Sequence, residues 1–171
     1  MKQSPAVAKN RPTNMSFAAA VSRIVELQWI RLKRATLSID AENVDSLPAE
    51  LRFDTTVRHS HEFNAEVGFI DVKVEYRLDV LNEAAGSVRE AMVEAEFQLR
   101  YSVPVGSSFQ SNELRWFAEL NGTLNSWPYW REMAQTVLGR AGLGSLTLPL
   151  WRAPVVPVDS SGSPIKSVVS E

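Results

Sequence analysis

The sequence contains no cysteine and only two histidines among its 171 residues. Without thiols it can form no disulfide, no thiolate metal site and no cysteine nucleophile, and this fits a reducing compartment, so we expect a cytoplasmic protein. The sequence also lacks an apolar run of the ~18 residues that a membrane helix needs. The short apolar run 17–21 is interrupted by Ser22 and Arg23, so we expect no secretory signal and no membrane insertion.

A dominant charge of one sign is missing as well. The formal net charge is -2, which gives no argument for a nucleic-acid partner. Basic residues predominate in the first 34 residues, where Glu26 is the only acid, and acidic residues predominate further along the chain. We interpret this asymmetry as an internal balance of solvated charges.

Two long alternating segments stand at the centre of the chain, residues 69–80 and 91–103. Apolar and polar side chains alternate along both, which is the two-residue period of a strand with one apolar and one polar face. Residues 82–89 between them include Gly86 and are typical of a turn. The sequence therefore predicts a long antiparallel hairpin whose apolar face needs a cover.

Two further strands are expected before this hairpin. The first covers residues 28–39, with a phase slip near Lys33-Arg34, and the second covers residues 50–61. A helix that begins near Ser16 precedes them.

Two helices are expected after the hairpin, over residues 112–120 and 128–138. Asn121-Gly122 is typical of a helix end, and Ser126 with Pro128 is typical of a helix start. The sequence thus predicts an α+β fold: a four-stranded antiparallel sheet with long strands, an N-terminal helix and two C-terminal helices packed on one face. We assign residues 15–152 to one domain, residues 1–14 to a flexible tail and residues 153–171 to a disordered tail.

The residues that could carry chemistry are few. His59 and His61 share one strand face, and the alternatives are a strand end leaving the core, a pH-sensitive contact, or a metal site with Asp54, Glu62 or Glu66 as third ligand. The glycine-rich run 139–144 follows a helix, whereas a phosphate-binding loop precedes one. We therefore expect no catalytic residues, no metal and no cofactor, and we expect the protein not to be an enzyme.

The carboxylates of the predicted hairpin lie on its polar face beside basic neighbours. We interpret them as a solvated face with cross-strand ion pairs, and also as a candidate docking surface for a partner. They are Asp71, Glu75, Glu94 and Glu96.

Apolar residues are in excess at the predicted connections. Two interpretations stay open: these residues cap one end of the core, or they form a hydrophobic groove for an extended or unfolded partner chain. The residues concerned are Val44, Leu47, Leu124, Trp127, Trp130, Leu146, Leu148 and Trp151.

The run Trp127-Pro128-Tyr129-Trp130-Arg131-Glu132, together with Leu146-Thr147-Leu148-Pro149, resembles the C-terminal part of SecB-type and SecB-like chaperones. The resemblance implies an ATP-independent holdase that binds unfolded or aggregation-prone polypeptides in hydrophobic grooves. It also implies a homotetramer built as a dimer of dimers. The client-binding residues that it implies are Val44, Leu47, Leu124 and Trp127, with Phe53, Trp130 and Leu138 as neighbours.

The resemblance leaves the partner open between two kinds. Export SecB docks the translocase motor SecA through an acidic sheet face, which here would use Asp71, Glu75, Glu94 and Glu96. The helix predicted near Ser16 and the mild net charge are closer to SecB-like relatives that protect an antitoxin. A scaffold that uses the same fold for protein binding without chaperone activity is the alternative, since fold does not fix function.

Overall fold

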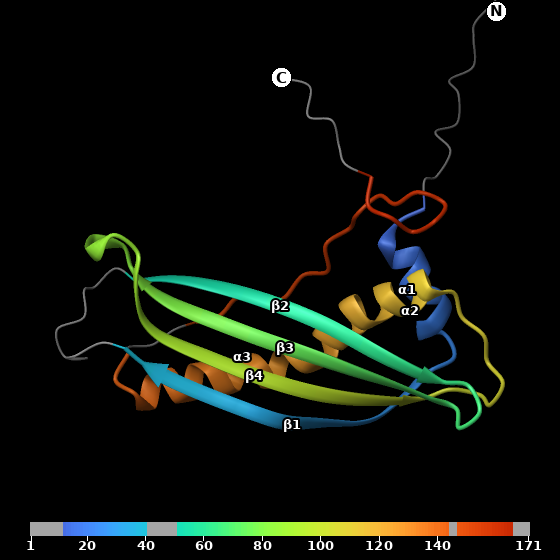
Figure 1. The fold of residues 1–171 in the computed structure, drawn as a ribbon, viewed down its shortest axis with the longest axis horizontal. Coiled ribbons are helices and arrows are strands. Elements are labelled where there is room, and N and C mark those ends of the chain that lie inside the picture. Colours follow the sequence, from blue (N-terminus) through green and yellow to red (C-terminus); the bar gives the residue numbers. More distant parts are fainter. Residues whose placement is uncertain (1–11, 41–50, 144–146, 166–171) are drawn as a thin grey trace, which may run out of the picture.

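A computed structural model describes residues 12–40, 51–143 and 147–165 of the chain. The elements follow in the order α1 (Asn14–Ser22), β1 (Glu26–Ile39), β2 (Leu51–Asn64), β3 (Phe69–Asn82), the 3₁₀ turn η2 (Glu83–Ala85), β4 (Val88–Ser102), α2 (Ser111–Phe117), the π-helical segment η3 (Ala118–Gly122) and α3 (Thr123–Arg140). Figure 1 shows a long twisted sheet with α3 along one face, and α1 beside α2 at one end. The predicted α+β fold with helices on one face of a four-stranded antiparallel sheet is confirmed.

The predicted hairpin is the centre of the sheet, which has the order β1-β4-β3-β2 with antiparallel neighbours throughout. Every second side chain along β3 and β4 is buried. The turn between them closes where the backbone N–H of Ala85 donates to Oδ1 of Asn82 (3.2 Å). Gly86 then adopts a φ of 76°, a left-handed conformation that favours glycine.

Strands β1 and β2 form the two edges of the sheet. The register between β1 and β4 shifts between Leu32 and Arg34, which confirms the predicted phase slip, and shifts again between Leu27 and Trp29. These irregularities bring Leu27, Leu32 and Leu37 opposite core-facing residues of β4, although they are five residues apart, an odd number that would alternate faces in a regular strand. Strand β2 ends at Asn64, beyond the predicted end at residue 61.

The predicted break between two C-terminal helices is wrong, because α2, η3 and α3 form one uninterrupted helical run. Gly122 lies against β3, where a Cβ atom would come 2.9 Å from Cγ1 of Val72. Ser126 does not cap a helix start; its buried hydroxyl donates to the carbonyl of Gly122 (2.6 Å). The glycine therefore serves a close approach of the helix to the sheet rather than a helix end. No helix in the described ranges is long and apolar enough to cross a membrane.

The core lies between α3 and the apolar face of β3 and β4. Its largest fully buried side chain is Trp130, which stacks on Tyr76 with ring centroids 5.1 Å apart. The Tyr76 hydroxyl lies 2.8 Å from Oγ of Ser126, so its polar atom is satisfied inside the core. The helical run thus supplies the cover that the apolar face of the hairpin requires.

The predicted disordered C-terminal tail, residues 153–171, falls within the described residues up to residue 165. Residues 147–165, which we call the C-terminal segment, cross the helical side of the molecule in a largely extended form (Figure 1). Leu148 and Val158 are buried, and Val158 packs in a small apolar cluster with Ala18, Trp116 and Leu120. Prolines spread through the segment hide this packing from a periodicity analysis, because they impose no helical or strand period.

Candidate functional site

An apolar groove opens between α1, the start of α3 and the C-terminal segment. It encloses ≈ 290 Å³ and has mostly apolar walls. Leu124 stands at its rim with 55% of its surface exposed. The lining residues are Met15, Ala18, Ala19, Ser22, Leu120, Asn121, Leu124, Trp151 and Ala153.

Small side chains and one polar contact are found among the lining residues of this groove. Ala18 and Ala19 leave room beside α1 because their side chains are small. Oγ of Ser22 lies 3.1 Å from Oδ1 of Asn121, which links α1 to η3. Sequence reasoning expected the helix of α1 but assigned it no role in a site, because the partner wall is distant in the chain.

Of the predicted client-binding residues that the structure describes, Leu124 alone lies in the groove. Trp130 and Leu138 are fully buried, and Trp127 is nearly so, with its Nε1 donating to the carbonyl of Pro149 (3.0 Å). These three side chains are therefore core residues of the described chain, which corrects their placement on a client-binding surface. Their alternative interpretation, a cap on the core, fits this burial.

The remaining predicted client-binding residues lie apart from the groove. Phe53 is half-buried on β2, pairs with Val80 of β3 and packs against the edge of the core. Val44 and Leu47 lie outside the described residues. The structure thus brings Leu124, but not Phe53, together with α1 and Trp151.

A second apolar surface runs along the edge strand β1. We call it the β1 strip, and it consists of Leu27, Leu32, Leu37 and Ile39. All four lie opposite buried residues of β4, so they continue the covered face of the sheet. They are nevertheless at least 39% exposed, because nothing in the described chain covers this edge. Such a strip on an edge strand is typical of a surface that another chain covers.

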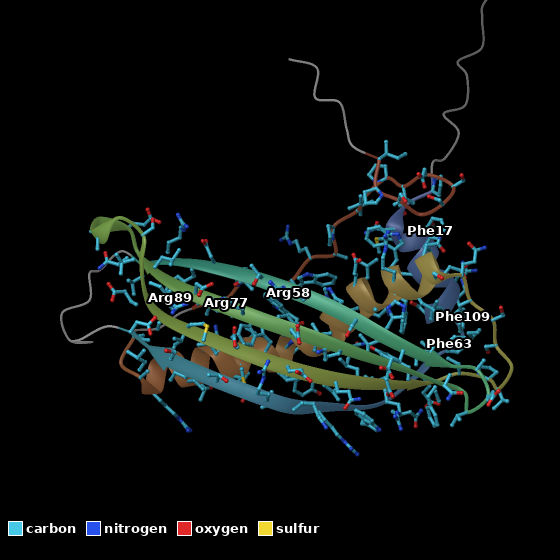
Figure 2. All side chains as sticks on the ribbon, in the orientation of Figure 1. Phe17, Arg58, Phe63, Arg77, Arg89 and Phe109 are labelled. Atoms are coloured by element: carbon cyan, nitrogen blue, oxygen red, sulfur yellow. The ribbon has the colours of Figure 1, made fainter. Side chains whose placement is uncertain are left out.

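The opposite face of the sheet is polar and rich in ion pairs, as the sequence predicts. Arg58, Arg77 and Arg89 lie along it in Figure 2 and come from three different strands. Each of the four predicted docking carboxylates has a basic partner within 4.0 Å. The pairs are Asp71 with Arg100 (2.6 Å), Glu75 with Lys73 (2.8 Å), Glu94 with Arg77 (3.3 Å) and Glu96 with Lys73 (4.0 Å).

These ion pairs change the character of the polar face. The hydrogen bond from Lys73 lowers the pKa of Glu75, and the bond to Asp79 raises the pKa of Arg77, so the charged forms are favoured. The basic partners balance the carboxylates locally, and the face is therefore mixed in charge rather than acidic. A docking role for the four carboxylates stays a prediction.

The histidines of β2 differ in their surroundings. Nε2 of His59 lies 2.7 Å from Oγ1 of Thr123, whose own proton goes to the carbonyl of Glu119 (2.7 Å), so His59 is the donor. Burial lowers the pKa of His59 to about 4 and also lowers the pKa of His61. Within the described ranges, no three His, Cys, Asp or Glu side chains gather as a metal site would require. His59 thus joins β2 to the helical run.

Comparison with known proteins shows the fold through solved structures. The chain is similar to a SecB-like chaperone from Mycobacterium tuberculosis, determined in complex with a ChAD peptide from the HigA1 antitoxin: the TM-score is 0.70 at 21% identity, over 81% of this chain and 99% of the other. A protein of unknown function from Streptococcus agalactiae matches with a TM-score of 0.39 at 12% identity, over 74% of this chain and 97% of the other. No family model and no curated protein sequence matches the chain.

Proposed function

We propose that this protein is an ATP-independent molecular chaperone that holds unfolded or aggregation-prone polypeptides through its exposed apolar surfaces. The observation that carries the proposal is the apolar groove with the exposed Leu124 at its rim. Apolar surface left open to water does not stabilise the folded chain, and such surface is typical of a binding site. The fold shared with a SecB-like chaperone supports the same function.

The size of the groove favours weak and adaptable binding. A volume of ≈ 290 Å³ accommodates a few side chains of a client, and only a small number of polar groups would fix their orientation. Affinity for a long client would come from several such grooves acting together. This is the binding mode expected of a holdase, which releases its client without a chemical step.

We further propose a homotetramer built as a dimer of dimers. Support comes from the β1 strip, since an edge strand with exposed apolar side chains would be covered when it meets β1 of a second copy. Such a contact also pairs the free backbone groups of the edge. Several grooves would then belong to one particle, as multivalent holding requires.

Two kinds of partner remain candidates in a cytoplasmic setting. An antitoxin is supported by the fold likeness to a chaperone that was determined with an antitoxin peptide. The translocase motor SecA would instead dock on the polar face near Glu75 and Glu94. Binding of purified SecA distinguishes the two: an export chaperone binds it, and alanine at both carboxylates weakens that binding, whereas an antitoxin chaperone does not bind it.

The proposed function is tested by aggregation assays with a chemically unfolded model protein and no ATP. Wild-type protein should suppress light scattering at near-equimolar amounts, and Leu124→Asp should weaken this suppression several-fold because a charge in the apolar groove disfavours an apolar client. Val88→Asp is the matched control, since Val88 is similarly exposed (52%) but is the first residue of β4 and does not line the groove. A wild-type protein that does not suppress aggregation contradicts the proposal and favours the non-chaperone scaffold.

A further inference from the structure

The C-terminal segment is bound to the helical side of the molecule through its backbone. The side chain of Asn14 donates to the carbonyl of Pro154 (2.8 Å) and accepts from the N–H of Val156 (2.9 Å). The backbone N–H of Asn14 donates to the carbonyl of Val156, and the N–H of Val158 donates to the carbonyl of Pro12, both at 3.0 Å. Asn14 is fully buried, and its hydrogen bonds to the segment satisfy the polar atoms that burial removes from water.

A second set of donors comes from α2. The indole Nε1 of Trp116 and the guanidinium of Arg115 both donate to the carbonyl of Gly162, each at 2.8 Å. Nδ2 of Asn112 donates to the carbonyl of Ser161 (2.7 Å). In the described part of the chain, every hydrogen bond between the segment and the helices uses the backbone of the segment and none uses its side chains.

Between residues 154 and 162, the main apolar anchor of the segment is the side chain of Val158. Val158 is fully buried in the cluster of Ala18, Trp116 and Leu120, whereas Val155 is 65% exposed. The two prolines that precede the anchor, Pro154 and Pro157, carry no N–H that would need a partner. An extended chain therefore fits this surface if it offers backbone carbonyls, the N–H groups at the positions of Val156 and Val158, and a small branched side chain at the position of Val158.

We infer that the faces of α1 and α2 around Asn14 and Trp116 form a binding site for extended, proline-containing polypeptide, and that the C-terminal segment is its displaceable resident occupant. Recognition through backbone carbonyl and N–H groups accepts many sequences, as when an extended peptide is bound through its main chain. Trp151 and Ala153 of the segment also form a wall of the apolar groove, so displacement of the segment enlarges that groove. The inference rests on the proposed function only in its claim that clients compete with the segment.

The site is tested first by peptide binding in trans. The probe is a fluorescein-labelled peptide with the sequence of residues 153–165, and the protein is the full chain carrying Val158→Ser, which loosens the resident anchor but leaves α1 and α2 intact. Because a tethered segment competes at high effective concentration, we expect the peptide to bind this variant at least 10-fold more tightly than wild type. Val155→Ser is the matched control and should bind as weakly as wild type.

A lock on the resident segment gives the reverse result. Thr13 and Pro157 form an isolated antiparallel bridge, and such a non-hydrogen-bonded pair has its Cα atoms about 4.5 Å apart, within the range of a disulfide. The chain has no native cysteine, so Thr13→Cys/Pro157→Cys creates a single pair. Added to Val158→Ser, the oxidised lock should abolish binding of the peptide, and reduction should restore it.

Several outcomes overturn the inference. If the peptide binds equally to wild type, Val158→Ser and the oxidised lock, it binds at another site. If it binds to none of them, the C-terminal segment is a fixed part of the fold and is not displaceable. Hydrogen exchange on wild type serves if the variants do not fold: the amides of Val156 and Val158 should exchange faster than those of β3, and exchange only by global unfolding contradicts displacement. Peptide binding without aggregation suppression would retain this site and refute the chaperone proposal alone.

Discussion

Gly122 sets how closely the helical run approaches the sheet. A Cβ at this position would lie 2.9 Å from Cγ1 of Val72 and 3.1 Å from Cγ2 of Val74, and both valines belong to the central strand β3. We expect Gly122→Ala to lower the free energy of unfolding by about 1 to 3 kcal/mol, because the helix must shift to relieve the overlap. Urea unfolding followed by tryptophan fluorescence measures this change.

Gly139 provides the matched control for this substitution. It lies in α3, and an added Cβ would meet nothing within 4 Å apart from the nearby backbone of its own helix, so Gly139→Ala should raise the free energy of unfolding by up to about 1 kcal/mol through helix propensity alone. If Gly122→Ala is also stabilising, the close approach to β3 does not constrain the helical run.

His59 makes the stability depend on pH. Burial lowers its pKa from 6.5 to about 4 in the folded chain, so the unfolded chain binds the proton more readily between these values. The neutral ring contributes fully to the free energy of unfolding above pH 6.5, and this contribution is lost as the pH falls toward 4. After allowance for the part of the ring that solvent reaches, we expect about 1 to 2 kcal/mol of acid destabilisation from this residue.

The measurement compares wild type with His59→Gln between pH 7.5 and pH 4.5. Glutamine can still donate to Oγ1 of Thr123 but does not titrate, so the unfolding free energy of the variant should fall less steeply with acid than that of wild type. The difference between the two slopes isolates His59 from the carboxylates and from His61. Parallel slopes would mean that the ring is not shielded from solvent.

The contrast between Leu124 and Trp130 shows what sequence reasoning can reach at the residue scale. Both were predicted to bind clients because both are apolar residues near a predicted connection. The break predicted at Asn121-Gly122 does not exist, so Trp130 lies inside a continuous helix and faces Tyr76. The pattern identified the apolar excess correctly, but burial depends on where the helix meets the sheet.

The contact between α1 and the C-terminal segment depends on Asn14. Asn14→Ala removes the two side-chain hydrogen bonds to the segment, at Pro154 and Val156, and should loosen the segment on α1 while the sheet stays folded. Limited proteolysis measures this: cleavage within residues 153–165 should accelerate several-fold, with no change in the unfolding of the remaining fragment. Asn125→Ala is the control, because its side chain bonds Tyr101 instead.

At the scale of elements, the strands were more predictable than the helices. Alternation along β3 and β4 fixes which side chains face the core, and the slip in β1 is visible as an interruption of that alternation near Lys33. The helical run could not be derived in the same way, since Asn121-Gly122 is typical of a helix end and only the close approach to Val72 explains why a glycine stands inside a continuous helix. Local signals were overruled there by packing against a distant strand.

At the scale of the whole molecule, the β1 strip is the exposed apolar surface that best fits a contact with a second chain. Leu32 and Leu37 are 49% and 39% exposed although they continue the core face of β4. We therefore expect light scattering to give wild type a mass about four times the 19.1 kDa of one chain, as the proposed dimer of dimers requires.

Charges on the strip test whether this surface forms the contact. Leu32→Asp/Leu37→Asp should convert the tetramer into smaller species, because two carboxylates would be desolvated against a second β1. Val67→Asp/Val105→Asp changes two residues that are more exposed (57% and 72%) but lie off the strip, and it should leave the mass unchanged. A wild type that stays monomeric at all concentrations would contradict the assembly, and each groove would then hold its client alone, with correspondingly weaker suppression of aggregation.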